Sequence, residues 1–317
     1  MDGMVAVTYR CNSRCIMCHT WAHQSAPEDE IRPEHLLTLP KLVRLNITGG
    51  EPFLRDDLSD ILDVAKTRAK RVVISTNGFL TRKTLKVMEK HKDVGIRISV
   101  DGIGETHNRI RGFRRAHEAS FETLRGLKEL GVKDLGIAVT ASDQNAGELV
   151  AVYDVARRHG VELATAILHN AYYFHIDDNE ITDKARVEAG LQSLVKAFLR
   201  SPSPKDWFRA YFTKGFIDQM YGRPRELKCT MVTDSFFIDP YGDIRPCNVI
   251  DYVFGNIKET PFDVIWNSDK AREARMMVDR CAVNCWMIGS VGHLIRRKFW
   301  IPLSWIAQHK FFARNVS

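Results

Sequence analysis

Three cysteines, Cys11, Cys15 and Cys18, lie within eight residues near the start of the 317-residue chain. Thiolates at this spacing are metal ligands, and three of them leave one iron of a four-iron cubane cluster without a protein ligand. Such an iron can bind a small molecule directly. A structural zinc site completed by His19, His23 or a distant cysteine is the alternative that this loop leaves open.

A second cysteine set lies in the last third of the chain and supplies four thiols, Cys229, Cys247, Cys281 and Cys285. The first two flank FFIDPYGDIRP, which predicts two short strands joined by a tight turn that would bring both sulfurs together. Seven cysteines, three of them crowded into one loop, argue against a set of disulfides. The four ligands suit either a second four-iron cluster or a zinc module.

Strand-like runs alternate with helical patterns up to about residue 168, as in repeated strand–helix units with a parallel sheet. The six predicted strands lie at residues 4–9, 43–48, 71–75, 95–100, 134–140 and 161–168. The predicted fold is therefore α/β, a partial (β/α)6 TIM-like barrel, with a small C-terminal domain that contains the hairpin. In such barrels the loops after the strands build the active site, and the first cysteine loop follows the first strand.

Glycine-rich or small polar motifs follow the next three predicted strands. They are Gly49-Gly50-Glu51-Pro52, Ser75-Thr76-Asn77-Gly78 and Ser99-Val100-Asp101-Gly102. Two glycines let the backbone approach a ligand closely, and a carboxylate can pair with an ammonium group. Each motif alone is also ordinary turn chemistry. Their repetition at successive strand ends favours a ligand site.

In the order of these motifs, residues 4–286 resemble the radical S-adenosylmethionine (SAM) superfamily. The resemblance implies that the first three cysteines ligate a [4Fe–4S] cluster that cleaves SAM to a 5′-deoxyadenosyl radical. One guanidinium of HNRIRGFRR, with Arg111 the choice, can hold the SAM carboxylate. The other implied SAM contacts are Met17 near the adenine, Gly49, Gly50 and Glu51 at the amino group, and Ser75, Asn77, Ser99 and Asp101 at the ribose and carboxylate.

The second cysteine set resembles the abbreviated auxiliary-cluster domain called twitch, a shortened SPASM domain. This resemblance implies one auxiliary [4Fe–4S] cluster, so that two [4Fe–4S] clusters and SAM are the expected cofactors. The expected divisions are a barrel at 1–200, a helical linker at 201–228, the auxiliary-cluster domain at 229–286 and a basic aromatic tail at 287–317.

Assigning all seven cysteines to clusters leaves none to donate a hydrogen atom, which argues against epimerisation by a thiol. A ligated auxiliary cluster can accept an electron, so we expect an oxidoreductase that dehydrogenates its substrate. His169, after the sixth strand, is the expected base, with Asp234 and Tyr241 as further candidates. The expected electron donor is a flavodoxin or ferredoxin.

The substrate class stays open at this stage. Family members with one auxiliary cluster act on aminoglycoside sugars or on the molybdenum-cofactor precursor, whereas many SPASM relatives modify peptides. Only three residues precede the first predicted strand, which favours a small or sugar-like substrate over a peptide. Radical cross-linking or epimerisation of a peptide is the alternative.

The net charge of +7 is concentrated in the tail, where five Lys or Arg and no Asp or Glu follow Cys285. Because the rest of the chain is nearly neutral, we expect no nucleic-acid partner. The tail HLIRRKFWIPLSWIAQHKFFARN has an interfacial composition that suits either a membrane surface or a cover over the barrel. No signal peptide or spanning run occurs, which predicts a cytoplasmic protein with membrane contact as an option. A non-catalytic, zinc-stapled binding protein is the rival class.

Overall fold

The computed structural model describes residues 1–312, apart from the side chain of Phe312. Its centre is one nine-stranded sheet in the order β6-β5-β4-β3-β2-β1-β7-β8-β9. The strands are β1 Asp2–Ala6, β2 Leu42–Thr48, β3 Ala69–Thr76, β4 Gly95–Ser99, β5 Leu135–Ala141, β6 Glu162–Ile167, β7 Ser235–Ile238, β8 Asp243–Arg245 and β9 Gly255–Asn256.

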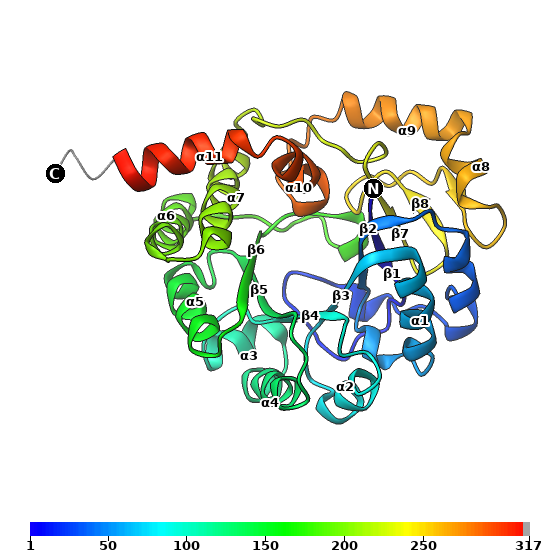
Figure 1. Cartoon of the computed structure of the whole chain (residues 1–317), viewed down its shortest axis with the longest axis horizontal. Helices are drawn as coiled ribbons and strands as arrows, with labels where there is room; N and C mark the ends of the chain where they lie inside the picture. The colour runs from blue at the N-terminus through cyan, green and yellow to red at the C-terminus, as the bar shows by residue number, and fades with distance from the viewer. Residues whose placement is uncertain (313–317) are drawn as a thin grey trace.

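Helices cover the outside of the curved sheet (Figure 1). The helices of the strand–helix units are α1 Leu58–Arg68, α2 Thr81–Met88, α3 Glu105–Arg111, α4 Ala116–Glu129, α5 Leu149–Arg158 and α6 Lys184–Arg200. The later helices are α7 Pro204–Met220, α8 Phe262–Trp266, α9 Asp269–Asp279, α10 Ile288–Arg297 and α11 Trp300–Ile306.

The predicted partial barrel is confirmed, because β1 to β6 are all parallel to their neighbours. The predicted hairpin is confirmed too: β7 and β8 pair antiparallel, with Phe237 opposite Arg245. The sequence did not indicate that β7 also pairs in parallel with β1, so that the hairpin extends the main sheet. Burial explains the apolar strand runs, since Val5, Leu45 and Ile96 have no exposed surface.

One strand boundary differs from the sequence-based prediction. The first strand ends at Ala6 rather than at residue 9, because the carbonyls of Thr8 and Arg10 accept hydrogen bonds from the turn after β2. The segment 201–228, expected as a helical linker, contains α7, which begins at Pro204, a residue suited to the first position of a helix. This helix packs along α6 and against β6 and α11.

No helix among residues 1–312 combines the length and apolar composition needed to cross a bilayer. The last helical segment projects beyond α6 and α7 at the left of Figure 1. Part of the predicted tail, including Arg314, lies outside the described residues.

Candidate active site

The first cysteine loop follows β1 at the carboxyl edge of the parallel strands. Burial is the main cause that raises the pKa of the Cys11 thiol to about 12, and Cys15 and Cys18 contribute to the same shift. The three thiols are therefore close enough to interact. Cys15 is buried, and burial also raises the pKa of Cys18. Buried, mutually interacting thiols in the number that a SAM-binding cubane requires fit such a cluster.

Backbone hydrogen bonds attach this loop to neighbouring elements on both sides. The amides of Arg14 and Ile16 donate to the carbonyls of Arg111 and Ile110 at 3.1 and 3.0 Å. On the other side, the amide of His19 donates to the carbonyl of Phe174 at 2.7 Å. The loop is thus held between the end of α3 and the segment after β6.

Position 50, which lies against the first cysteine loop, requires glycine. A Cβ there would lie 2.2 Å from the carbonyl oxygen of Arg10, the residue before the first cysteine. The amide of Glu51 donates to that same oxygen at 2.8 Å. The hydroxyl of Tyr173 donates to the carbonyl of the neighbouring Gly49. The glycine pair therefore brings two backbone segments into contact, and the ligand approach predicted for it stays a prediction.

Glu51 has no exposed surface, and burial raises its pKa to about 7. Its Oε1 accepts hydrogen bonds from the Thr76 hydroxyl at 2.8 Å and the Phe53 amide at 3.1 Å, and its Oε2 accepts one from the Asn77 amide at 2.7 Å. The carboxylate therefore joins the end of β2 to the end of β3. This connection was not foreseen in the sequence, where Glu51 was predicted to contact SAM.

The remaining predicted SAM contacts lie along the same edge. Asn77 Nδ2 donates to Oδ1 of Asn12 in the cysteine loop at 2.7 Å. Ser75 and Ser99 are half-buried at the ends of β3 and β4. Met17 is half-buried in the cysteine loop. The structure thus gathers the predicted set at one edge of the sheet.

Asp101 and Arg111 form a buried ion pair at this edge. The Asp101 carboxylate has no exposed surface and lies 2.5 Å from Arg111 Nη2, and its Oδ1 accepts a hydrogen bond from the Thr140 amide at 2.8 Å. Arg111 Nη1 lies 3.8 Å from Sγ of Cys15. The guanidinium therefore faces the cysteine loop and is held by Asp101. Direct contact of either residue with SAM stays a prediction.

The four thiols of the second cysteine set also interact with one another. Burial is the main cause that raises the pKa of Cys285 to about 12, and the charges of Cys229, Cys247 and Cys281 all act on it. The amides of Val249 and Ile250 both donate to Sγ of Cys247 at 3.4 Å. Within residues 1–312, no three His, Cys, Asp or Glu side chains surround a single metal-ion position. Four thiols that act on one another, one of which accepts two amide hydrogen bonds, have the chemistry of an iron–sulfur ligand set.

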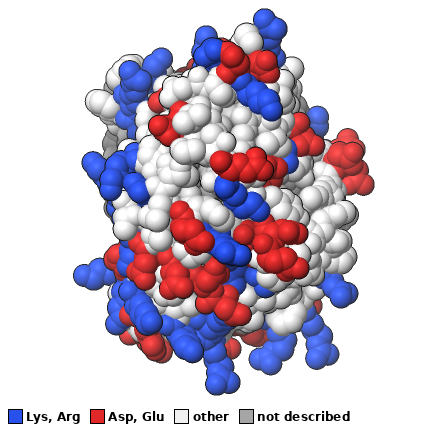
Figure 2. All heavy atoms as spheres, turned by 90° about the vertical axis from the view of Figure 1, so that its right-hand side faces the viewer, with Lys and Arg blue, Asp and Glu red and all other residues white. Residues whose placement is uncertain are grey.

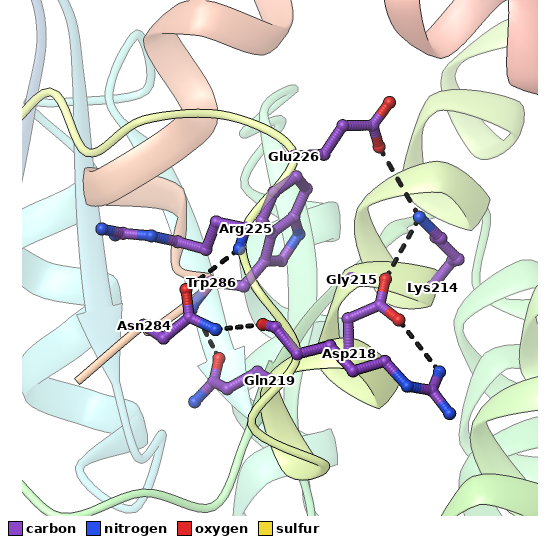
Figure 3. Close-up of a pocket in the computed structure, with 9 residues that line it drawn as sticks. Lys214, Gly215, Asp218, Gln219, Arg225, Glu226, Asn284 and Trp286 are labelled. Carbon is purple, nitrogen blue, oxygen red and sulfur yellow. Dashed lines mark hydrogen bonds and ion pairs between the residues drawn. The ribbon is translucent and has the colours of Figure 1, made fainter. Parts of the chain in front are cut away.

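The loop that carries Cys281 and Cys285 is fastened to α7 around a small cavity of about 10 Å³, room for roughly one water (Figure 3). The amide of Trp286 donates to Oε1 of Gln219 at 2.7 Å, and its indole donates to the carbonyl of Phe212 at 2.9 Å. A Cβ at Gly215 would lie 2.3 Å from this indole. Helix α7, within the expected helical linker, therefore contacts the loop that carries two of the four cysteines of the second set.

A hydrogen-bonded bridge connects the two cysteine sets. The hydroxyl of Tyr9, just before the first loop, lies 2.9 Å from that of Tyr172, which donates to Oδ2 of Asp239 at 3.1 Å. Nε of Arg245 donates to the same oxygen at 3.2 Å, and this residue lies just before Cys247. The guanidinium also stacks 4.1 Å from the centroid of the Tyr172 ring. Asp239 and Arg245 lie within the predicted hairpin FFIDPYGDIRP, but neither these residues nor Tyr9 were predicted to lie between the two cysteine sets.

A cavity of about 480 Å³ opens beside this bridge, within the size range of small-molecule sites. The segment after β6 supplies most of its lining, and Val249 supplies the side of the second cysteine set. The lining residues are Asn170, Ala171, Tyr172, His175, Ile176, Asp177 and Val249.

Two histidines near this cavity have an unpaired ring nitrogen. Nδ1 of His169 donates to the carbonyl of Ile167 at 2.8 Å, so Nε2 carries the lone pair and has no hydrogen-bond partner within residues 1–312. Burial lowers the pKa of His169 and keeps it neutral. His175, which the sequence did not single out, lines the cavity and stacks on His23 at 4.5 Å between ring centroids. Its Nε2 is likewise buried without a partner in the described residues.

The two further base candidates separate in space. Asp234 lies at the amino end of β7, where its carbonyl accepts a hydrogen bond from the Asp2 amide. This end is opposite to the edge that carries the first cysteine loop. The Asp234 amide donates to the carbonyl of Thr230, the residue after Cys229, at 2.9 Å, so Asp234 lies beside the second cysteine set and its role as a base stays a prediction. Tyr241 lies at the cysteine edge, with its ring centroid 5.7 Å from that of Tyr9.

Comparison with known proteins decides the family. The Radical SAM superfamily model matches residues 5–156, and the model of the SPASM iron–sulfur cluster-binding domain matches residues 229–286. The chain contains a radical SAM domain and a SPASM domain. SAM and a [4Fe–4S] cluster are therefore its cofactors, with further iron–sulfur in the SPASM domain. This assignment favours iron–sulfur ligation over both zinc alternatives.

Several named proteins are similar in sequence to this radical SAM protein. It is 33% identical to Fe-coproporphyrin III synthase of Methanosarcina barkeri, over 47% of this chain and only 39% of that relative. It is 26% identical to pre-heme d1 synthase of Dinoroseobacter shibae, over 87% and 76% of the two chains. It is 24% identical to the sporulation killing factor maturation protein SkfB of Bacillus subtilis, over 90% and 68%.

Solved structures share the fold of this radical SAM protein. The AdoMet-bound structure of anSMEcpe has a TM-score of 0.65 and 17% identity, over 89% of this chain and 86% of that one. SuiB of Streptococcus suis bound to S-adenosylmethionine has a TM-score of 0.61 and 16% identity, over 84% and 65%. These likenesses support the partial barrel with a C-terminal extension.

Proposed function

We propose a residue-level assignment of the two clusters. Cys11, Cys15 and Cys18 would hold the SAM-binding cluster, and Cys229, Cys247, Cys281 and Cys285 would hold the auxiliary one. The burial and mutual interaction of the thiols within each set support this assignment. When bound, these groups supply a 5′-deoxyadenosyl radical that abstracts a hydrogen atom and a site that accepts one electron. A flavodoxin- or ferredoxin-type donor would supply the electron that cleaves SAM.

The reaction that the geometry supports best is a two-electron oxidation of a substrate bound in the 480 Å³ cavity. The observation that carries this proposal is the position of the cavity, between the segment after β6 and Val249, two residues beyond Cys247. A substrate CH–OH group there would lose its carbon-bound hydrogen atom to the radical, one electron to the auxiliary site and its hydroxyl proton to a base. Loss of these three particles leaves a product with one more double bond.

The proton acceptor is a neutral histidine in this proposal. His169 directly precedes Asn170 of the cavity lining and keeps a buried lone pair at Nε2, because its Nδ1 hydrogen is used by the Ile167 carbonyl. His175 is the alternative within the cavity lining. Tyr172 lines the cavity and donates to Asp239, so it would orient the substrate and not take up a proton.

A small polar substrate such as a sugar fits the lining better than a purely apolar one. Asn170, Tyr172, His175 and Asp177 offer hydrogen-bond donors and acceptors. A peptide side chain is the second candidate, since a protein named for killing-factor maturation matches 90% of this chain. Heme synthases match over similar lengths, so the comparisons alone do not select the substrate.

Deuterium transfer tests the proposed reaction. The protein is reconstituted without oxygen, reduced, and incubated with SAM and deuterated candidate sugars or peptides. Appearance of deuterium in 5′-deoxyadenosine, with a product that has lost two hydrogens, supports oxidation. A product of unchanged mass would refute oxidation in favour of redox-neutral chemistry.

A further inference from the structure

The C-terminal helices expose large apolar side chains that the active site does not use. Trp300 is 56% exposed, Phe299 53%, Leu303 41% and Phe311 55%. They gather in and around α11, which projects from the body of the molecule (Figure 1). Isolated exposed apolar residues are common, but a run of them within one short segment marks an interaction surface.

The opposite side of α11 is anchored to the protein. Pro302 and Ile306 are buried, and the Trp305 ring lies 5.8 Å from that of Tyr211 in α7, measured between centroids. Trp300 and Leu303, which are three residues apart, share the outer face. The helix therefore has two apolar sides, one packed on α7 and one facing solvent. The inner side explains why the segment is ordered, and the outer side lacks a partner among residues 1–312.

Positive charge lies directly beside this outer face. Arg296, Arg297 and Lys298 are consecutive and exposed, and no Asp or Glu follows Asp279 in the sequence. Arg296 pairs with Asp2, whereas Arg297 and Lys298 form no ion pair within residues 1–312. In contrast, acidic and basic side chains are interspersed on the side of the molecule that carries α8 and α9 (Figure 2).

We propose that the end of α10 together with α11 binds the surface of an anionic lipid bilayer. Aromatic and aliphatic side chains on an anchored helix insert at the headgroup boundary, while neighbouring cations attract acidic headgroups. The lack of acidic residues after Asp279 makes the charge of this surface complementary to such a bilayer. This surface is separate from the 480 Å³ cavity, so the inference does not depend on the proposed reaction.

Vesicle flotation of the full reconstituted chain tests this inference. The probe is a vesicle of phosphatidylglycerol mixed with phosphatidylcholine, with pure phosphatidylcholine for comparison. Wild-type protein should float with the mixed vesicles. The double substitution R297Q/K298Q should weaken this binding by roughly thirtyfold, because each substitution removes the attraction of one positive charge to the acidic headgroups. Trp300→Ser should weaken it by roughly tenfold.

Val264→Ser is the matched control, because Val264 is also 56% exposed but lies on α8. This variant should float like the wild type. Thermal unfolding verifies that each variant folds. If Trp300→Ser does not fold, R297Q/K298Q still tests the inference. Wild-type protein that stays unbound to the mixed vesicles would overturn the inference. So would a dimer in lipid-free buffer that Trp300→Ser dissociates, because the face would then bind a second copy.

Discussion

Replacement of Asp101 by asparagine tests how the first cysteine loop is held. Asp101 has no exposed surface, and its partner Arg111 is only 12% exposed. The substitution retains an oxygen that can accept from the Thr140 amide but removes the negative charge. Arg111 would then be a buried cation without a counter-ion beside Cys15.

The expected cost follows from this burial. Removing one partner of a buried ion pair destabilises a protein by about 3–5 kcal/mol. Asp134→Asn is the matched control: Asp134 also pairs with arginines, at 2.8 Å to Arg71 and 2.9 Å to Arg97, but it is 31% exposed. Solvent screening should limit its cost to about 1 kcal/mol.

Urea unfolding followed by circular dichroism measures both variants, and iron analysis of the reconstituted proteins reports whether the loop still assembles a cluster. We expect Asp101→Asn to lose more unfolding free energy than Asp134→Asn and to retain less iron. Equal, small losses in both variants would refute the buried-pair reasoning. Normal iron content in Asp101→Asn would refute the link between Arg111 and the cysteine loop.

Three further predictions address other parts of the site. Cys247→Ser should remove roughly half of the iron, because only the auxiliary cluster loses a ligand, and unchanged iron by elemental analysis would exclude Cys247 from the ligand set. Tyr172→Phe should lower the unfolding free energy by roughly 1–3 kcal/mol in urea, because the Tyr9 hydroxyl and Asp239 lose their shared partner, and an unchanged transition would contradict the bridge. Burial raises the pKa of Glu51 from 4.5 to about 7, so the folded state binds this proton more tightly than the unfolded state does. The unfolding free energy should therefore fall as pH rises between these values, and Glu51→Gln should flatten that slope; an unaltered slope would contradict the assignment.

The sequence predicted the parts of the fold that depend on local pattern. Six apolar runs marked the six parallel strands, and the turn in FFIDPYGDIRP marked the β7–β8 hairpin. These signals are local because hydrophobic periodicity and turn conformation are properties of short segments.

Contacts between distant segments were not predictable in the same way. The pairing of β7 with β1, the ion pair of Asp101 with Arg111, and the bridge from Tyr9 to Asp239 all join residues that only the packed sheet brings together. The same limit applies to Asp234, because its sequence position did not reveal that it lies at the end of β7 away from the first cysteine loop.

We assign one four-iron cluster to each of the two cysteine sets. Iron, acid-labile sulfide and zinc analysis of protein purified without oxygen, combined with Mössbauer spectroscopy, tests this assignment. We expect about eight irons per chain, in two cubane environments, and negligible zinc. About four irons with one zinc would contradict the auxiliary electron acceptor, and stoichiometric zinc without iron would contradict the radical mechanism itself.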